Sequence, residues 1–178
     1  MRYLRIPKER IGVLIGHKGE TKSIIEKIAK VKLDIDSDEG EITIDEHDAK
    51  DPILGLKTED VIRAIGRGFS PEHALEIFNE EKEFYVFDIH DYVGKKENHV
   101  RRLKSRIIGK NGKTKRLIEN LTGSSLSIYG HTVSVIADME HMDITKRALD
   151  MLLSGSKHSA VYQFVEREMK KLRMGDFY

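Results

Sequence analysis

Apolar positions follow two different periods along this chain, and the order in which the periods occur is found twice. Runs that alternate between apolar and polar residues, typical of strands with one buried face, lie at residues 31–35, 41–45, 126–129 and 132–136. Further short strands are predicted at the start of each half, near Leu4 and from Phe84 to Ile89. Helical spacing of apolar residues fills the stretches between them. Each half is therefore predicted to be strand, helix, helix, strand, strand, helix.

The two halves also repeat their sequence. Residues 15–35 match residues 108–128 without a gap, and 9 of these 21 positions are identical. A repeat of about half the chain indicates a duplicated domain, because solenoid repeats have units of about 20–50 residues. In a chain of 178 residues we therefore expect two domains, at residues 1–82 and 83–178, each with an extra C-terminal helix.

Both copies carry Gly-x-x-Gly between two helical patterns, at Gly16 to Gly19 and at Gly109 to Gly112. Glycine lets the chain turn sharply and lets another backbone approach. The second helix begins directly after the loop, so its free amides and the positive end of its dipole favour a phosphate there. A single GxxG also occurs at ordinary helix corners. In this order of elements, however, it is the pattern of a KH domain, in which the loop clamps about four nucleotides of a single strand.

The sequence thus predicts an α+β fold of two tandem eukaryotic-type (type I) KH domains. Each should be a three-stranded antiparallel sheet packed on helices, with its GxxG loop exposed. The bacterial type differs because a helix and strands precede its GxxG unit. In the first domain we expect a loop over residues 48–57 and then a helix capped by Thr58, followed by a helix that Ser70 caps and Pro71 begins.

Charge is distributed unevenly between the two halves, although the net charge is only +1. Residues 1–82 hold 14 Lys and Arg against 18 Asp and Glu, whereas residues 83–178 hold 17 against 12. The stretch from Lys95 to Arg116 has ten basic residues and one acid, Glu97. Because this stretch surrounds the second GxxG, it favours phosphate binding over a merely solvated face.

Comparison of the two copies assigns most of the RNA affinity to the second. His17 is replaced by Lys110, Glu20 by Lys113, and the one opposing change is Lys18 to Asn111. The predicted contacts in the second domain are Arg102, Ser105, Arg106, Ile108, Gly109, Lys110, Asn111, Gly112, Lys113, Lys115, Arg116 and Ser127. The secondary set in the first domain is Gly16, His17, Lys18, Gly19 and Lys22.

No catalytic, metal or cofactor site is predicted. The chain has no cysteine, and no two of its eight histidines stand at helical i, i+4 spacing with a carboxylate in metal-ligand order. Residues 34–45 resemble a calcium loop, but the glycine is at the seventh position and the twelfth is not Glu. We therefore expect a protein that is not an enzyme. With no signal peptide and no apolar run near 18 residues, we expect a cytoplasmic location and no membrane partner.

Three stretches carry a more specific resemblance, namely Ala64 to Pro71, Ser105 to Gly112 and Leu153 to Tyr162. With the tandem KH pattern, they resemble the archaeal ribosome-biogenesis KH proteins, counterparts of the eukaryotic Partner of Nob-one, over nearly the whole chain. The resemblance implies binding to the 3′-terminal region of small-subunit rRNA. It also implies contacts with a Nob-type endonuclease and with the alpha subunit of translation initiation factor two.

Three alternatives stay open at this point. The chain could be a protein-interaction scaffold whose KH units have lost RNA, a general mRNA-binding KH protein, or a nuclease whose site is not recognised. A basic GxxG favours RNA binding over the scaffold. The linker near Lys82 is short and is not rich in Gly or Ser, and we expect a monomer.

Overall fold

The computed structural model describes residues 1–175, and the chain divides after Glu80 into two units. Unit 1 contains β1 (Arg2–Arg5), α1 (Lys8–Ile15), η1 (His17–Gly19), α2 (Glu20–Ala29), β2 (Lys32–Asp36), β3 (Glu41–Asp45), α3 (Pro52–Gly66), α4 (Pro71–Leu75) and η2 (Glu76–Phe78). Here η denotes a 3₁₀ turn. The predicted order of elements is confirmed in this unit.

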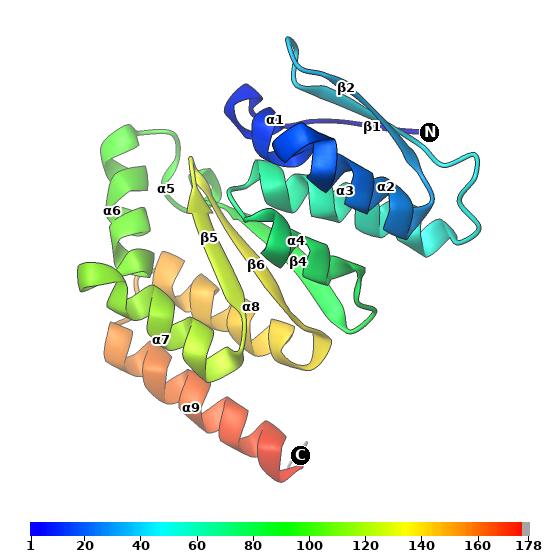
Figure 1. Cartoon of the computed structure of the whole chain (residues 1–178). Helices are drawn as coiled ribbons and strands as arrows, with labels where there is room; N and C mark the ends of the chain where they lie inside the picture. The colour runs from blue at the N-terminus through cyan, green and yellow to red at the C-terminus, as the bar shows by residue number, and fades with distance from the viewer. Residues whose placement is uncertain (176–178) are drawn as a thin grey trace. The chain divides into compact units, whose positions relative to one another are not determined.

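Unit 2 repeats that order, with a short additional helix after its first strand and a longer helix at its end (Figure 1). It contains β4 (Lys82–Asp88), α5 (His90–Val93), α6 (Glu97–Ile108), η3 (Lys110–Gly112), α7 (Lys113–Thr122), β5 (Ser125–Tyr129), β6 (Thr132–Asp138), α8 (Met139–Leu153) and α9 (His158–Met174). The short α5 was not predicted. No helix of the described residues is long and apolar enough to cross a membrane.

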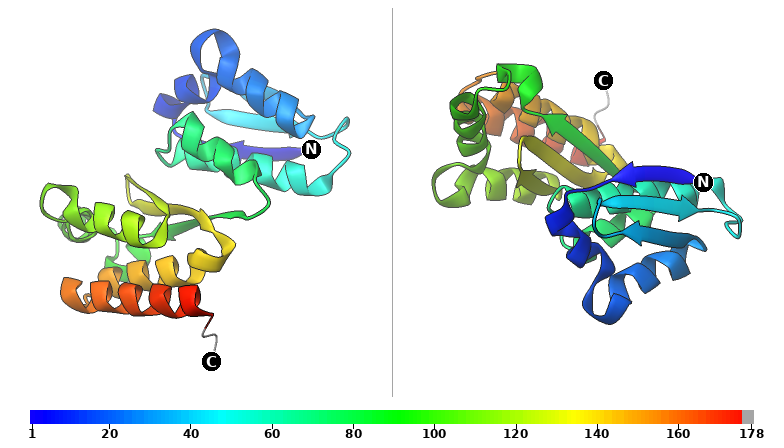
Figure 2. Two further views of the ribbon diagram at one scale, coloured as in Figure 1. Left: turned by 60° about the horizontal axis from the view of Figure 1, so that its bottom comes forward. Right: turned by 90° about the horizontal axis from the view of Figure 1, so that it is seen from above.

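Each unit has one three-stranded antiparallel sheet with its third strand in the middle, in the order β1-β3-β2 or β4-β6-β5. Figure 2 shows each sheet with its own helices. In both hairpins the repeated leucine faces the third strand, with Leu33 opposite Ile44 and its counterpart Leu126 opposite Val135, although the turns differ in length, residues 37–40 against 130–131. The predicted sheets and helices of a type I KH fold are therefore confirmed.

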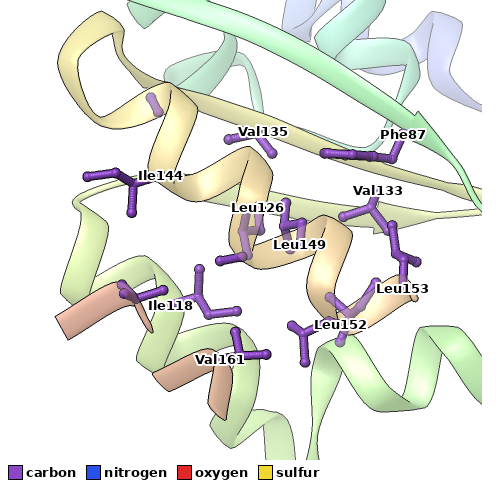
Figure 3. Close-up of a cluster of buried hydrophobic side chains, with 14 of the residues drawn as sticks. Phe87, Ile118, Leu126, Val133, Val135, Ile144, Leu149, Leu152, Leu153 and Val161 are labelled. Carbon is purple, nitrogen blue, oxygen red and sulfur yellow. The ribbon is translucent and has the colours of Figure 1, made fainter. Parts of the chain in front are cut away.

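The core of unit 2 lies between its sheet and helices α6 to α9. Figure 3 shows Leu149 and Leu152 of α8 among Val133 and Val135 of the sheet. Helix α9 packs against α7 and α8. One face of this helix is a packing surface, with these residues buried: Val161, Phe164, Val165 and Met169. At about 25 cal/mol per Å² of apolar surface removed from water, such packing supplies most of the driving force for folding.

The predicted start of the last helix of the first KH unit was wrong. Helix α3 begins at Pro52, and the Asp51 side chain caps it by accepting from the Ile53 amide at 2.9 Å. Thr58 is fully buried within the helix, and its hydroxyl donates to the Leu54 carbonyl at 2.7 Å. Asp followed by Pro is itself a cap and first-turn signal, and it stands about two helical turns before the cap signal of Thr58.

A half-buried arginine joins the helix before each GxxG loop to the end of the unit's third long helix. In unit 1, Arg10 donates through Nε to the Ile65 carbonyl at 2.7 Å and through Nη2 to a carbonyl four residues further on. In unit 2, Arg106 donates to the Leu152 carbonyl at 3.1 Å and likewise to a carbonyl four residues on. The contact satisfies carbonyls that a helix end leaves without intrahelical partners.

Replacing Arg106 should therefore destabilise the protein. Because both of its charge-assisted hydrogen bonds are lost and the carbonyls stay partly buried, we expect Arg106→Ala to lower the free energy of unfolding by about 2–3 kcal/mol. Arg102→Ala, an exposed site on the same helix, should change it by less than about 0.5 kcal/mol. Urea denaturation followed by circular dichroism measures both. Equal stability losses would show that Arg106 has no special structural role.

Candidate nucleic-acid interface

The two GxxG loops have nearly the same backbone. Gly16 and Gly109 have φ of 76° and 73°, and Gly19 and Gly112 have φ of 78° and 75°. A 3₁₀ turn joins the two glycines of each loop, and the two residues between them are exposed. The predicted exposed helix-to-helix loops are therefore confirmed.

The first glycine of each loop is required for two reasons: its φ is positive, and a side chain there would collide with the next helix. A Cβ added to Gly16 would lie 2.8 Å from the Thr21 amide nitrogen, and one added to Gly109 would lie 2.7 Å from that of Thr114. Both threonines are buried, and the Thr114 hydroxyl is 2.8 Å from the Tyr162 hydroxyl of α9. The loop thus rests on the start of the second helix, and neither α2 nor α7 has a side-chain cap on its first amides.

The third residue of each loop is also left-handed, with φ of 51° at Lys18 and 55° at Asn111. Asparagine adopts this conformation far more readily than lysine does. The replacement of Lys18 by Asn111, which looks unfavourable when only charge is counted, therefore relieves backbone strain.

The predicted contacts of unit 2 fall into two groups. Arg102, Ser105, Ile108, Lys110, Asn111, Lys113 and Arg116 are exposed on α6, the loop and α7. Arg116 reaches back over the loop, because a Cβ on Gly112 would lie 3.3 Å from Arg116 Nη1. The half-buried ones are Arg106, Gly109, Gly112, Lys115 and Ser127. Apart from the apolar Ile108, the exposed group supplies side-chain donors on one continuous stretch of chain.

Lys115 is partly occupied by an internal contact. Its Nζ lies 3.1 Å from Glu119 Oε1, and the same oxygen accepts from the Leu126 amide at 2.9 Å. Glu26 of unit 1 accepts from the Leu33 amide at 2.8 Å in the same way. This glutamate is identical in the two copies because it ties the helix after the loop to the following strand.

In unit 1 the residues predicted as secondary RNA contacts lie on a loop with the same backbone, but they carry fewer positive charges than those of unit 2. His17 and Lys18 are exposed between the glycines, and Lys22 is half-buried on α2. Glu20 is in the first turn of α2, where its carboxylate stands close to the loop. Asp34 is exposed on β2 at the position that Ser127 has in β5. A phosphate would meet two carboxylates here that unit 2 does not have.

A pocket of about 510 Å³ extends the surface of unit 2 along α6. Its lining is His90, Lys95, Glu97, Val100, Arg101, Lys104, Ser105, Ile108, Gly130 and His131. Only Ser105 and Ile108 belong to the predicted contacts. Most of the other residues lie on or just before α6, but His90 comes from α5 and Gly130 and His131 come from the turn between β5 and β6, which the sequence does not place beside that helix.

Two of these residues form a stacked pair beside a carboxylate. The rings of His90 and His131 have centroids 4.2 Å apart and planes 9° apart. Asp88 Oδ1 lies 2.8 Å from His131 Nδ1 and accepts from the His90 amide at 2.9 Å. Burial alone would raise the pKa of Asp88, but the hydrogen bonds from His131 and His90 outweigh it, so that the pKa lies below its ordinary value.

The same three residues are close enough for a metal ion to be considered, with ligand atoms within 4.8 Å of one another. An imidazole binds a metal through a lone pair in its own plane. Two rings stacked in nearly parallel planes do not direct these lone pairs at one point. This arrangement suits a carboxylate-imidazole hydrogen bond better than a metal centre.

Comparison with known families identifies both units. The Krr1 KH1 domain model matches residues 6–80, and the eukaryotic type KH-domain (KH-domain type I) model matches residues 83–170. A KH domain-containing protein of Methanocaldococcus jannaschii is 49% identical over 175 residues, covering 98% of this chain and 76% of its own. The RNA-binding protein PNO1 of Oryzias latipes is 31% identical over 107 residues. This match covers 60% of this chain and only 44% of PNO1.

Solved structures agree with this fold over nearly the whole chain. Dim2p from Pyrococcus horikoshii has a TM-score of 0.85 at 42% identity and covers 93% of this chain and 98% of its own. A chain in the crystal structure of an a/eIF2alpha–aDim2p–rRNA complex from the same organism has a TM-score of 0.87, also at 42% identity. That match covers 96% of this chain and 94% of the other.

The left-handed third loop position gives a stability prediction. We expect Lys18→Asn to raise the free energy of unfolding by about 0.5–1 kcal/mol and Asn111→Lys to lower it by a similar amount, because the backbone preference outweighs the change of one exposed charge at these sites. Thermal and urea denaturation of the two matched variants measure the effect. Changes of the same sign in both variants would contradict the conformational explanation.

Proposed function

The chain belongs to the tandem KH-domain family that includes PNO1 and archaeal Dim2p, and from this premise we propose that it is a single-stranded RNA-binding assembly factor of the small ribosomal subunit. The observation that supports this most is the loop of unit 2. Lys110 and Asn111 are exposed there between two glycines, directly before the uncapped first amides of α7. Amides, helix dipole and lysines together favour an RNA backbone.

The proposed RNA is the 3′-terminal region of small-subunit rRNA. A relative 42% identical to this chain was solved in a complex with rRNA and a/eIF2alpha, which supports both ligands as candidates here. We include a Nob-type endonuclease among the proposed partners because of the family resemblance. We further propose that the chain acts as a cytoplasmic monomer with domains at residues 1–82 and 83–178.

Unit 2 is proposed to carry most of the RNA affinity. Its contacts are the predicted set on α6, the loop, α7 and β5, centred on Lys110, Lys113 and Arg116. Unit 1 has the same loop frame, but Glu20 and Asp34 would repel a phosphate near it. A secondary RNA contact through Lys18 and Lys22, or a protein partner, fits unit 1 better.

Two other functions are supported less well. A pure protein scaffold would not need a basic, exposed GxxG loop in unit 2, and a general mRNA-binding role leaves the likeness to an rRNA-bound relative unexplained. A catalytic role has no supporting site in the geometry described above. We therefore propose binding, and an electrophoretic shift with magnesium, inspected for cleavage, tests this directly.

Paired variants test the division between the units. Lys110→Asp with Asn111→Asp keeps both glycines and places a residue tolerant of left-handed φ at position 111. We expect it to weaken binding of a small-subunit 3′-end RNA by about a hundredfold, through lost donors and added repulsion. His17→Asp with Lys18→Asp should cost less than about tenfold. Fluorescence anisotropy at one salt concentration compares them, with circular dichroism to verify folding. A loss from the unit 1 pair as large as that from the unit 2 pair would refute this assignment.

Binding should also be electrostatic and selective for single strands. Each neutralised phosphate releases counterions, so the slope of log K against log salt should be about −0.7 per contact and about −3 for a four-nucleotide site. Anisotropy titrations between 50 and 400 mM salt, about the range over which such slopes are measured, give the value. The matched control is the same RNA annealed to its complement. Equal affinity for the duplex would rule out a KH groove.

A further inference from the structure

We propose that unit 1 binds an amphipathic helix of a protein partner, on the face that α2 and the first half of α3 form and that corresponds to the face covered by α9 in unit 2. The helix inserts apolar side chains spaced three and four residues apart, and it carries a basic side chain on one flank. This face does not include the GxxG loop, so the proposal goes beyond RNA binding and does not depend on it.

The third long helices of the two units correspond residue by residue. Helices α3 and α8 both have 15 residues. Thr58 and Thr145, which are 87 positions apart, each donate a hydroxyl hydrogen bond to the carbonyl four residues before them, at 2.7 and 2.9 Å. The carbonyls of Ile65 and Leu152, which accept from the two arginines described above, are also 87 positions apart. Contacts of α8 in unit 2 can therefore be transferred to α3 position by position.

Unit 1 has only the first part of a helix like α9. With the same shift of 87, residues 71–78, which form α4 and η2, correspond to residues 158–165 of α9. Helix α9 continues from there to Met174, and Figure 1 shows the difference in length between α4 and α9. Among the described residues of unit 1, no segment corresponds to residues 166–174.

A lysine ends the short helix of unit 1. Lys57 of α3 donates through Nζ to the Ile77 carbonyl at 2.8 Å and to the Asn79 carbonyl at 2.6 Å. Such contacts satisfy carbonyls that a helix end leaves without partners. In unit 2 the position of Lys57 is taken by Ile144, which is buried, and α9 continues. The early end of the helix is therefore built into the contacts of unit 1.

The short helix leaves apolar side chains uncovered. Of the ten large apolar side chains that are exposed among the described residues, four lie on α2 and on the first two turns of α3, namely Ile24, Ile28, Ile53 and Leu56. The counterpart of Ile28 in the repeat is Leu121 of α7, which is half-buried and packs against the core that includes α9. A helix on this face of unit 1 would cover Ile24 and Ile28 in the same way.

The exposed residues of α3 are apolar where unit 2 is charged. Ile53 corresponds to Glu140 and Leu56 to Asp143, and both of these acids are exposed. Unit 1 thus has more apolar surface on this face than the unit in which a helix covers it. Because α2 and α3 pack against each other, the four side chains lie on neighbouring helices. Exposed apolar side chains grouped in this way mark an interaction site.

A carboxylate stands beside the uncovered face. Ile53, Lys57 and Asp60 share one side of α3, because they are at i, i+4 and i+7. Asp60 is half-buried, and no described residue forms a hydrogen bond or an ion pair with it. Burial raises the pKa of Asp60 above its ordinary value, although Arg63 and Lys57 act against this. A cation from a partner would stabilise this carboxylate.

The counterpart of Asp60 shows that this position faces the covering helix. It is Arg147 in unit 2, whose guanidinium lies 4.8 Å from the centre of the Phe164 ring of α9, and Arg167 of α9 lies 5.9 Å from the same ring. A helix placed like α9 on unit 1 would bring the residue at the position of Arg167 close to Asp60. With 18 acidic against 14 basic residues in residues 1–82, unit 1 favours a partner that is basic there.

The probe for this face is a peptide with the sequence of residues 164–174. A hydrocarbon staple that replaces the exposed Glu166 and Lys170 holds it helical, because an unstapled helix of this length is marginal in water. The peptide keeps Met169 and Leu172 as apolar contacts and Arg167 as the basic flank. Labelled with fluorescein and titrated with the full chain, it should bind saturably by anisotropy. The same peptide with Met169→Asp and Leu172→Asp should not bind.

Variants of the protein locate the binding face. Ile24→Asp with Ile28→Asp should weaken binding of the stapled peptide by at least about tenfold, and Asp60→Lys by about fivefold. The matched control is Met139→Asp, at an exposed apolar residue of unit 2, which should change the affinity by less than about twofold. Circular dichroism verifies folding. RNA affinity of the Ile24→Asp, Ile28→Asp variant should stay within about threefold of the wild type, since the GxxG loops are intact.

A measurement on the wild-type protein keeps the proposal falsifiable if the variants do not fold. A benzophenone side chain at position 169 of the peptide should crosslink to α2 or α3 on irradiation. Crosslinks confined to unit 2, where the peptide would displace α9, overturn the proposal, as do an absence of binding and unchanged binding by the double aspartate variant. If that variant loses RNA affinity while the wild type ignores the peptide, the face is an RNA contact instead. Failure of the wild type to bind RNA overturns the proposed function alone.

Discussion

The loops of both units depend on one close contact, that of a glycine with the amide of a buried threonine at the start of the next helix. Gly16 against Thr21 and Gly109 against Thr114 leave no room for a Cβ. This contact, with the left-handed residues that follow, keeps the two middle residues exposed and the helix amides uncovered. Because the contact is the same in both units, the loop frame is a property of the fold. What it binds is decided by the side chains placed on it.

Residues that are identical in the two copies make internal contacts, which supports the view that the backbone of the loop is set by the fold and its ligand by the exposed side chains. Glu26 and Glu119 each accept a hydrogen bond from a backbone amide near the start of the next strand, that of Leu33 and that of Leu126. An arginine joins the third long helix to the helix before the loop in both units, but it does not stand at equivalent positions of the repeat. Arg10 in unit 1 and Arg106 in unit 2 nevertheless make the same carbonyl contacts. Counting Arg106 as a binding charge from sequence alone overlooks this internal contact, and its contribution to RNA binding stays a prediction.

Much of the fold was predictable because the repeat has no gap. The repeat predicted two copies of one domain, and the spacing of glycines and apolar residues predicted the order of elements within each copy. The start of α3 was missed because Asp51-Pro52 and Thr58 are both good local cap signals, and only burial of Thr58 decides between them. The short α5 has no periodicity to detect. The His90–His131 pair was out of reach, since it forms only when the end of β4 meets the β5–β6 turn.

The charge difference between the loops is concentrated at three exposed pairs of positions. His17, Glu20 and Ser23 correspond to Lys110, Lys113 and Arg116. A glutamate in the first turn of a helix stabilises it, whereas lysine and arginine there oppose the dipole by about 0.3–1 kcal/mol each. Helix α2 has the favourable acid and α7 has none. Unit 2 thus has basic residues at a helix start, where acidic ones would stabilise the helix. A bound phosphate would offset this unfavourable interaction with the helix dipole. Such departures are expected at binding sites.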